Sequence, residues 1–382
     1  MTVKLYDENA YLKEFTATVV SCEKCGEGFA VELDRTAFFP EAGGQSSDRG
    51  FLGNACVTDV QIQNEKIIHF TDTPLQTGST VSGALDFDRR FDFMQQHSAE
   101  HIVSGIAHRL YGCENVGFHL SEDIVTLDFD KELTREQISK VEQLANSAVF
   151  ANKAIHTYYP DSQALKALSY RSKKEIEGSI RIVEIEDTDT CACCAPHVKS
   201  TGEVGLIKLL GAEKLRGGVR LQLKAGMRAL DDYNSKYENT LKISNALCVK
   251  QEETAEAVNR LCEKVSELKA SLGEMKRKSI LSKAQSYTPD REITAEFEPD
   301  LEMKELQLYS DALFKKAGGI RAVFSGCNRE FLFAICGDAK ALDSFFTHFK
   351  EQFTVKGGGR NGMVQGTVFA EKNDIIEAFE RD

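Results

Sequence analysis

The pattern of apolar and polar positions changes several times along the chain. Over residues 1–90, short runs rich in β-forming residues lie between turn residues, at 15–20, 29–33 and 80–87. Such runs are typical of β-strands, and their spacing predicts a small β-barrel or a strongly curved sheet. A loop-like stretch over 38–45 separates the second run from the third.

A helical pattern begins at residue 91. Its apolar positions recur at spacings of one, three and four, which predicts a helix that ends near Gly112. A second helix is predicted from Thr134 to about Phe150. Strands are predicted at 180–185, 204–210 and 220–223. This mixture predicts an α+β domain over residues 91–228.

Residues 229–287 form a predicted helical segment. Between Ala229 and Lys283 the chain holds one glycine and no proline. Six apolar residues step by three and four positions in alternation, which is the a/d pattern of a coiled coil: Val258, Leu261, Val265, Leu268, Leu272 and Met275. Because the pattern covers fewer than three heptads, two interpretations stay open. The helix packs within its own chain, or residues 258–275 form a homodimer seam.

The last part of the chain, 288–382, has the pattern of a mixed α/β domain. Short buried strands are predicted at 322–324 and 331–335, and helices at 300–317 and 339–353. A glycine-rich loop over 356–362 follows, whose backbone a ligand could approach closely.

Composition and charge limit the classes of function. The formal net charge is −12, from 47 basic and 59 acidic residues. This argues against a uniformly basic nucleic-acid binder, because phosphate neutralisation needs concentrated Lys and Arg. No stretch approaches the roughly 20 apolar residues of a membrane span, and the first residues do not resemble a secretory signal. We therefore expect a cytoplasmic protein with no membrane partner, whose 11 cysteines serve metal binding or chemistry more than disulfides.

The strongest chemical signal has two halves. His97 and His101 are four residues apart on a predicted helix, so both imidazoles lie on one face. Cys193 and His197 are spaced to hold the same ion from a tight turn. Three histidines and one cysteine suit one tetrahedral Zn²⁺ per chain. Cys191 and Cys194 also lie close to His197, so the residues alone leave the cysteine ligand open.

The first half also fits a competing motif. His97 to His101 reads His-x-x-Glu-His, the inverted zinc-peptidase signature, in which Glu100 would be the general base. This hypothesis gives no role to the cysteine-rich loop or to residues 30–50. We therefore prefer the four-ligand site, with Glu100 as a polar helix residue.

Three stretches, in order, resemble a known family. Residues 33–50, with Pro40-Glu-Ala-Gly-Gly-Gln45, look like the signature of the alanyl-tRNA editing domain. Residues 90–101 resemble its His-x-x-x-His helix, and residues 193–205 resemble its Cys-x-x-x-His half, on whose spacing Cys193 is the ligand. The C-terminal residues resemble the DHH-associated RNA-binding domain that also ends alanyl-tRNA synthetase. The chain is thus similar to the long form of the AlaX-type trans-editing proteins.

The resemblance implies hydrolysis of tRNA(Ala) mischarged with serine, or with glycine, at a zinc site. An alanine-activating pocket cannot strongly reject either amino acid, so a second site must clear these errors. Thr36 and Gln45 fall on family positions near the bound amino acid, where a hydroxyl and a carboxamide suit serine. No catalytic residue beyond the metal site is implied. The alternative is a non-catalytic tRNA-binding protein on the same scaffold.

A full synthetase is not expected. Residues 1–30 are all that precede the editing motifs in this sequence, too few for an aminoacylation domain. We therefore expect no aminoacylation activity and no binding of ATP or free alanine.

Two short elements are expected to contact tRNA. Residues 206–228 carry six Lys and Arg against one Glu, directly after the metal ligands. The residues predicted to bind tRNA are Lys214, Arg216, Arg220, Gly358, Gly359 and Arg360. The sequence predicts four domains: a β-barrel-like domain (1–90), a zinc-binding editing domain (91–228), a helical coiled-coil segment (229–287) and an RNA-binding-like domain (288–382).

Overall fold

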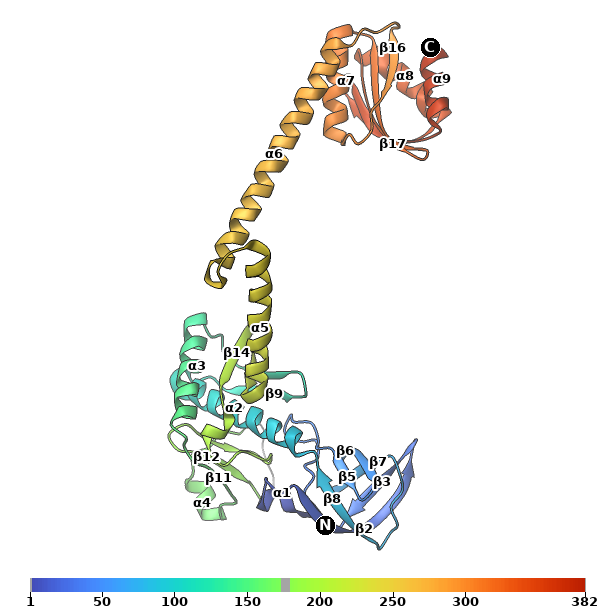
Figure 1. Cartoon of the computed structure of the whole chain (residues 1–382). Coiled ribbons are helices and arrows are strands. Elements are labelled where there is room, and N and C mark those ends of the chain that lie inside the picture. The colour runs from blue at the N-terminus through green and yellow to red at the C-terminus, as the bar shows by residue number, and fades with distance from the viewer. Residues whose placement is uncertain (1, 173–178, 382) are drawn as a thin grey trace. The chain divides into compact units, whose positions relative to one another are not determined.

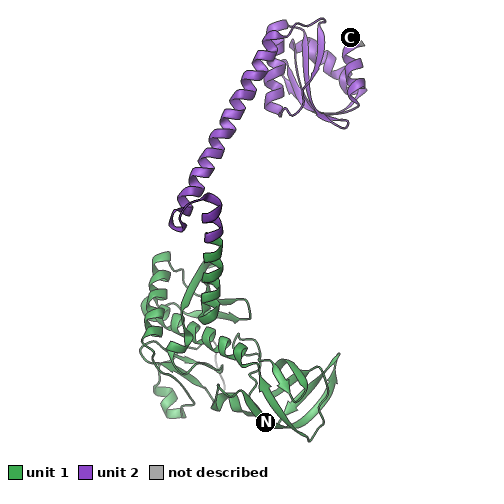
Figure 2. Cartoon of the chain, in the orientation of Figure 1, with its two compact units in different colours: residues 1–240 green, residues 241–382 purple. Residues whose placement is uncertain are grey.

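The chain has an α+β fold in the computed structural model, which describes residues 2–172 and 179–381. The predicted α+β class is thereby confirmed. Contacts between residues divide the chain into two compact units, residues 1–240 and 241–382 (Figure 2).

Six strands near the N-terminus close into a barrel, in the order β2-β3-β7-β6-β5-β8 (Figure 1). Along the first of them, Phe15, Ala17 and Val19 are buried, and the residues between them are more exposed. This alternation gives the barrel an apolar interior. The strands are β2 (Glu14–Cys25), β3 (Gly28–Leu33), β5 (Gly50–Leu52), β6 (Ala55–Gln63), β7 (Lys66–Thr71) and β8 (Thr80–Leu85).

Two short strands outside the barrel, β1 (Val3–Lys4) and β4 (Arg35–Thr36), form a separate parallel pair. The single-turn helix α1 (Leu5–Glu8) follows β1. The chain after β4 runs as a loop to β5 and contains the predicted loop over 38–45. This loop carries Gln45.

The rest of the first unit packs two sheets with α2 (Phe87–Tyr111) and α3 (Arg135–Phe150). One sheet has the order β14-β15-β10-β9, and the other β11-β12-β13. Their strands are β9 (Asn115–Leu120), β10 (Val125–Phe129), β11 (Ile155–Tyr158), β12 (Ile182–Ile185), β13 (Asp189–Ala192), β14 (Ile207–Leu215) and β15 (Gly218–Ala225). Two short helices complete this part, α4 (Ser162–Ala167) and the 3-10 turn η1 (Thr201–Val204).

Local signals set the ends of both long helices. Asp86 caps α2 by accepting a hydrogen bond from the backbone N–H of Arg89, and Gly112 ends it in the left-handed conformation, with φ 60°. Thr134 and Gln137 form a capping box at the start of α3. The two helices predicted in this region are confirmed. The middle of α2 is buried on all sides, so its polar residues need partners inside the protein.

The predicted helical segment is interrupted. It consists of α5 (Gly226–Leu247) and α6 (Thr254–Ser286), separated by a left-handed residue, Cys248 (φ 52°), and the 3-10 turn η2 (Gln251–Glu253). No glycine or proline marks this break. The six seam residues all lie on α6 with exposed fractions between 40% and 68%. Among the residues that the structure describes, nothing covers this seam in a coiled coil.

The second unit contains a five-stranded sheet in the order β16-β17-β18-β20-β19. One layer of core residues joins α6 and α7 to the sheet through Val323 and Ala334. The alternate residues, such as Phe324 and Phe333, belong to a second apolar core that contains residues of α8 and α9. The elements are α7 (Met303–Ala317), α8 (Ala339–Gln352), α9 (Lys372–Arg381), β16 (Ile293–Phe297), β17 (Ile320–Cys327), β18 (Glu330–Cys336), β19 (Thr354–Arg360) and β20 (Met363–Phe369).

The prediction of a glycine-rich loop over 356–362 is wrong for most of its length. Residues 356–360 belong to the edge strand β19, which pairs with β20 from Thr354 to Arg360. The glycines permit close pairing: a Cβ on Gly359 would lie 1.9 Å from the backbone oxygen of Met363. Only the turn at Asn361 and Gly362 remains outside the strands.

Candidate metal centre

The four predicted ligands come together inside the first unit. His97 and His101 lie on α2, and Cys193 and His197 lie in the loop after β13. The ligand atoms of all four side chains lie within 4.8 Å of one another. The three imidazole rings pack pairwise with centroids 4.7–5.5 Å apart. Two motifs almost 100 residues apart in the sequence therefore meet at one point in the fold.

The interatomic distances match a tetrahedral ion. Sγ of Cys193 lies 3.5 Å from Nε2 of His97 and 3.4 Å from Nε2 of His197. A tetrahedral Zn²⁺, with bonds of about 2.3 Å to sulfur and about 2.0 Å to nitrogen, places such donor atoms about 3.5 Å apart. Nε2 of His101 is buried without a hydrogen-bond partner among the described residues. Because an unpaired buried polar atom is costly, this nitrogen also points to a missing ligand.

Each histidine is held at its other ring nitrogen. Nδ1 of His97 lies 2.8 Å from Oε1 of Gln45, and Nδ1 of His197 lies 3.1 Å from Oγ of Ser98. Nδ1 of His101 lies 2.9 Å from Oδ2 of Asp189. A partner at Nδ1 orients the ring and leaves Nε2 for a metal.

The electrostatics favour metal-binding protonation states at Cys193 and His197. Burial raises the pKa of the Cys193 thiol, but the imidazoles of His97, His101 and His197 outweigh it and hold that pKa well below its usual value. Burial lowers the pKa of His197 to about 3. At neutral pH the group therefore offers a thiolate and a neutral imidazole, the forms that bind metal.

His101 has a more acidic environment than the other two histidines. Burial lowers its pKa, but the charge of Glu100 and the hydrogen bond to Asp189 more than compensate and raise it well above the usual value. Negative charge that stabilises an imidazolium also stabilises a bound cation nearby.

The two predicted substrate contacts occupy different positions relative to the metal centre. Gln45 contacts His97 directly, and its Nε2 is buried without a hydrogen-bond partner in the part of the chain that the structure describes. Thr36 is buried and its Oγ1 lies 2.8 Å from Nε2 of His69. The backbone N–H of Phe38 also donates to Thr36 Oγ1, over 3.1 Å. Thr36 therefore has no direct contact with the four metal donors among the interactions described.

A buried ion pair joins the loop that carries Gln45 to α2. The guanidinium of Arg90 donates to both carboxylate oxygens of Asp48 and to the backbone oxygen of Ala37. Asp48 also accepts a hydrogen bond from the N–H of Phe39. Because both charged side chains are completely buried, removing one partner would leave the other uncompensated, at a typical cost of about 3–5 kcal/mol. The pair therefore ties the loop to the helix that carries two of the metal donors.

Glu100, the general base of the competing motif, is a buried carboxylate within α2. Its Oε1 accepts hydrogen bonds from Ser104, at 2.7 Å, and Asn115, at 2.6 Å. Its Oε2 lies 3.8 Å from Nε2 of His101. Two strong donors on one oxygen are what a structural carboxylate needs, and they favour our assignment of Glu100 as a polar helix residue.

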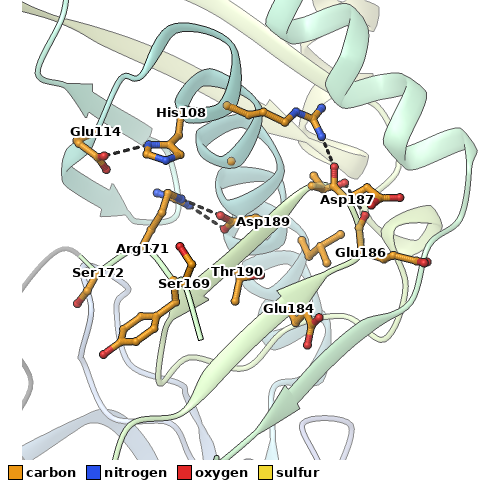
Figure 3. Close-up of a pocket in the computed structure, with 15 residues that line it drawn as sticks. His108, Glu114, Ser169, Arg171, Ser172, Glu184, Glu186, Asp187, Asp189 and Thr190 are labelled. Atoms are coloured by element: carbon orange, nitrogen blue, oxygen red, sulfur yellow. Dashed lines mark hydrogen bonds and ion pairs between the residues drawn. The ribbon is translucent and has the colours of Figure 1, made fainter. Parts of the chain in front are cut away.

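A polar cavity of about 820 Å³ has Asp189 in its wall. Figure 3 shows Arg171 and Asp189 side by side, and the ion pair between His108 and Glu114, which also line this cavity. Asp189 thus contacts the cavity on one side and His101 on the other.

The cations predicted to bind tRNA in the first unit are mostly paired with carboxylates. Lys214 lies 2.8 Å from Glu132, and Arg220 makes two 2.7 Å hydrogen bonds to Asp128. Lys208, Lys224 and Arg228 pair with Glu142, Asp232 and Asp92. Of the six cations over 206–228, Arg216 has no ion pair among the described residues. The local excess of positive charge in the sequence is therefore largely neutralised in space.

The remaining predicted tRNA contacts lie in the second unit. Gly358, Gly359 and Arg360 are exposed on the edge strand β19. One side of this strand pairs with β20, and its other side has no strand neighbour in the described sheet.

Four residues around the site were missed by the sequence reasoning. They are Ser98, Asp189, Arg171 and His69, which contact His197, His101, Asp189 and Thr36. Ser98 stands inside the His-x-x-x-His motif and Asp189 two residues before the cysteines, so their positions offered a weak signal. His69 and Arg171 lie far from every motif, and nothing in their local sequence marks them.

Comparison with known proteins decides the family. Residues 180–221 match the family described as threonyl and alanyl tRNA synthetase second additional domain. The chain is 30% identical over 385 residues to alanyl-tRNA editing protein Aarsd1-B of Xenopus laevis, covering 94% of this chain and 92% of the relative. The chain belongs to the alanyl-tRNA editing protein family.

Other relatives extend this result. The chain is 28% identical to alanyl-tRNA editing protein AlaX-L of Pyrococcus horikoshii, over 99% of this chain and 97% of that protein. It is 29% identical to alanine–tRNA ligase of Ignicoccus hospitalis over 73% of this chain, but only 32% of that longer protein. The family resemblance drawn from the motifs is confirmed over nearly the whole length. No helix among the described residues is long and apolar enough to cross a membrane.

Proposed function

We propose that this chain is a trans-editing hydrolase that deacylates Ser-tRNA(Ala), with Gly-tRNA(Ala) as a second substrate. The observation that supports it most is the convergence of His97, His101, Cys193 and His197 in a chain of this family. The substrate ester is already activated, so no covalent nucleophile is required, and we assign no catalytic residue beyond the metal site.

One Zn²⁺ per chain is the proposed cofactor. When bound, it supplies a local charge of about +1 beside a single thiolate, and this charge can polarise an ester carbonyl or position a water molecule. The chain's own residues orient the site. Gln45 holds His97 through Oε1, which leaves its two Nε2 hydrogens directed elsewhere in a buried position. These hydrogens can be donated to the aminoacyl group.

Thr36 is the proposed contact to the serine hydroxyl. Its hydrogen bond to His69 determines whether Thr36 donates or accepts in this contact. His69 donates Nδ1–H to the carbonyl of Val31, because a carbonyl can only accept. Nε2 of the neutral ring then accepts the hydroxyl hydrogen of Thr36. The remaining lone pair of Thr36 Oγ1 can only accept a hydrogen bond. Serine would therefore be recognised as a donor, and glycine would lack that interaction.

We further propose that tRNA binds through Lys214, Arg216 and Arg220 in the first unit and through Gly358, Gly359 and Arg360 in the second. Arg216, in the turn between β14 and β15, has the most available charge of the first group. A homodimer through 258–275 of α6 is also proposed, because six apolar side chains at heptad spacing are exposed there.

The function is tested by deacylation of purified Ser-, Gly- and Ala-tRNA(Ala). We expect Ser-tRNA(Ala) to be hydrolysed faster than Ala-tRNA(Ala), and His101→Ala to remove this activity. Equal slow loss of both aminoacyl groups would contradict the proposal. Binding of tRNA(Ala) without turnover would support the non-catalytic alternative.

The Glu100→Gln variant distinguishes the hypothesis of an inverted-motif peptidase from that of an editing hydrolase. A peptidase that uses Glu100 as general base loses nearly all turnover of peptide substrates in this variant. We expect no peptidase activity in the wild-type chain, and Ser-tRNA(Ala) hydrolysis in the variant to remain within about tenfold of wild type, because no step is assigned to this carboxylate.

A further inference from the structure

Asp189 differs from the other groups that hold the histidines. Gln45 and Ser98 are neutral, whereas Asp189 brings a carboxylate to Nδ1 of His101. It is the first residue of β13, and its side chain is almost completely buried, with an exposed fraction of 2%. A buried carboxylate needs a compensating charge.

Arg171 supplies that charge with a paired geometry. Its Nε lies 2.7 Å from Oδ1 and its Nη2 lies 2.8 Å from Oδ2 of Asp189 (Figure 3). The backbone of Arg171 is also fixed, because its N–H donates to Thr190 and its carbonyl accepts from Ala192, both at 2.9 Å. Two main-chain hydrogen bonds thus hold Arg171 beside β13, the strand that carries Asp189.

The packing of α2 against β13 also fixes the distance between Asp189 and His101. Gly105 lies one turn after His101, and a Cβ at this position would lie 2.6 Å from Cβ of Asp189 and 2.3 Å from the backbone oxygen of Thr188. The helix can approach the strand this closely only because residue 105 has no side chain.

A second set of possible metal ligands includes Asp189 itself. The side chains of His101, Asp189 and Cys191 also lie within 4.8 Å of one another and are all buried. An ion bound there would share His101 with the first group. However, both oxygens of Asp189 are already engaged by Arg171, and one also contacts His101.

We propose that Asp189, held by Arg171, is the positioning residue that keeps the hydrogen of His101 on Nδ1 and presents Nε2 to the metal of the proposed editing site. Arg171 at the same time keeps the carboxylate of Asp189 from becoming a ligand itself. The ion therefore binds to His97, His101, Cys193 and His197, and the second set stays a support. This inference rests on the proposed metal site but not on its substrate.

The test measures metal affinity without tRNA. Zn²⁺ dissociation constants are determined by competition with a chromophoric chelator for the wild type, Asp189→Asn, Arg171→Gln and Glu186→Gln, a control in the same cavity wall. We expect Asp189→Asn and Arg171→Gln to weaken Zn²⁺ binding about 10-fold to 100-fold, as loss of such outer partners does elsewhere. The control is expected to bind as the wild type does. Wild-type affinity in a folded Asp189→Asn variant overturns the proposal.

Two further measurements separate positioning from a general structural role. In the Zn²⁺-loaded wild type, the Nδ1 hydrogen of His101 should give a downfield proton NMR signal that Asp189→Asn shifts or removes, while those of His97 and His197 remain. Loss of all three signals together would overturn the assignment. Cys191→Ser should keep full Zn²⁺ affinity, and a large loss there would instead place the ion in the second set. Because none of these readouts uses tRNA, failure of the hydrolase proposal would leave them interpretable.

Discussion

Individual side chains of the metal centre combine two demands, because each histidine must bind an ion at one nitrogen and be oriented at the other. In this chain the orienting atoms come from three different elements: a loop for Gln45, α2 itself for Ser98, and β13 for Asp189. Cys193 completes the donor set, whereas the neighbouring Cys194 is exposed. The cysteines therefore have different expected roles despite being adjacent in sequence.

The identity of the cysteine ligand can be tested by a matched pair of substitutions. Cys193→Ser should lower bound Zn²⁺ to well under half an equivalent per chain, because a hydroxyl is a far weaker zinc ligand than a thiolate. Cys194→Ser should retain about one equivalent. Bound metal measured by atomic emission after gel filtration checks both, and loss of metal from Cys194→Ser alone would reverse the assignment.

A second prediction at this scale concerns Thr36. Thr36→Val removes the hydroxyl and should reduce hydrolysis of Ser-tRNA(Ala) about 5-fold to 100-fold, because the buried serine hydroxyl is left unpaired at a cost of roughly 1–3 kcal/mol. Hydrolysis of Gly-tRNA(Ala) should change much less, because glycine has no hydroxyl to recognise. Thr36→Ser, which keeps the hydroxyl, is the control. An equal decrease for both substrates would indicate that Thr36 serves the fold and not serine recognition.

The donor set could be predicted from the sequence, but its supports could not. The spacing of His97 and His101 is local, so helix geometry suffices to predict that half-site. In the other half-site, the choice of Cys193 over Cys191 and Cys194 rests on the family resemblance. The contact from Arg171 to Asp189 and that from His69 to Thr36 depend on how separate strands pair, which local patterns do not encode. The ion pairs along the basic stretch over 206–228 could not be predicted for the same reason, since the carboxylates that pair with it come from distant elements.

At the scale of elements, the barrel depends on a histidine in its interior. His69 lies on β7, is completely buried, and bridges the backbone of β3 at Val31 to Thr36 on β4. Burial lowers its pKa from 6.5 to about 4. A neutral His69 is thus part of the folded state at neutral pH, and it connects barrel stability to the hydrogen-bonding direction of Thr36.

This buried histidine predicts how stability depends on pH. Between pH 6.5 and pH 4 the unfolded chain binds a proton at residue 69 that the folded chain does not, so the free energy of unfolding decreases as pH falls through this window. The contribution of His69 over that range is roughly 3 kcal/mol. In the His69→Phe variant, the free energy of unfolding should fall less between pH 6.5 and pH 4. Urea titrations of the purified chain at several pH values measure this decrease. An equal dependence of the free energy of unfolding on pH in both proteins would contradict the assigned pKa.

Other elements were predictable to different degrees. The helices α2 and α3 have clear caps and apolar periodicity, so both were predicted from local signals. The strand β19 was not predicted, because its glycines have a low preference for strands and its structure depends on pairing with β20. The break between α5 and α6 has no glycine or proline, and it depends on a left-handed Cys248 that nothing in its sequence announces.

On the scale of the whole molecule, the exposed seam on α6 is an unusual feature, since apolar side chains at regular heptad spacing lie in contact with solvent. Exposure of this kind is a common mark of an interface. The seam lies within the second unit, on α6.

The proposed dimer predicts a change in mass when the seam is broken. Leu268→Glu places a charge in the centre of the seam and should convert a two-chain species into a one-chain species in sedimentation experiments at about 10–50 μM, because a lone charge in a coiled-coil core is strongly unfavourable. Glu263→Lys, at an exposed position outside the seam, should leave the mass unchanged. A wild-type chain that sediments as a monomer at these concentrations would rule out this dimer.

The central claim is that the four-donor metal centre serves hydrolysis of mischarged tRNA(Ala). The most direct measurement is the rate of Ser-tRNA(Ala) and Ala-tRNA(Ala) deacylation by the purified chain before chelation, after removal of metal, and after return of one equivalent of Zn²⁺. We predict preferential hydrolysis of Ser-tRNA(Ala), its loss in the metal-free protein and its recovery with Zn²⁺. Full activity toward Ser-tRNA(Ala) in a protein shown to be free of metal would contradict the claim.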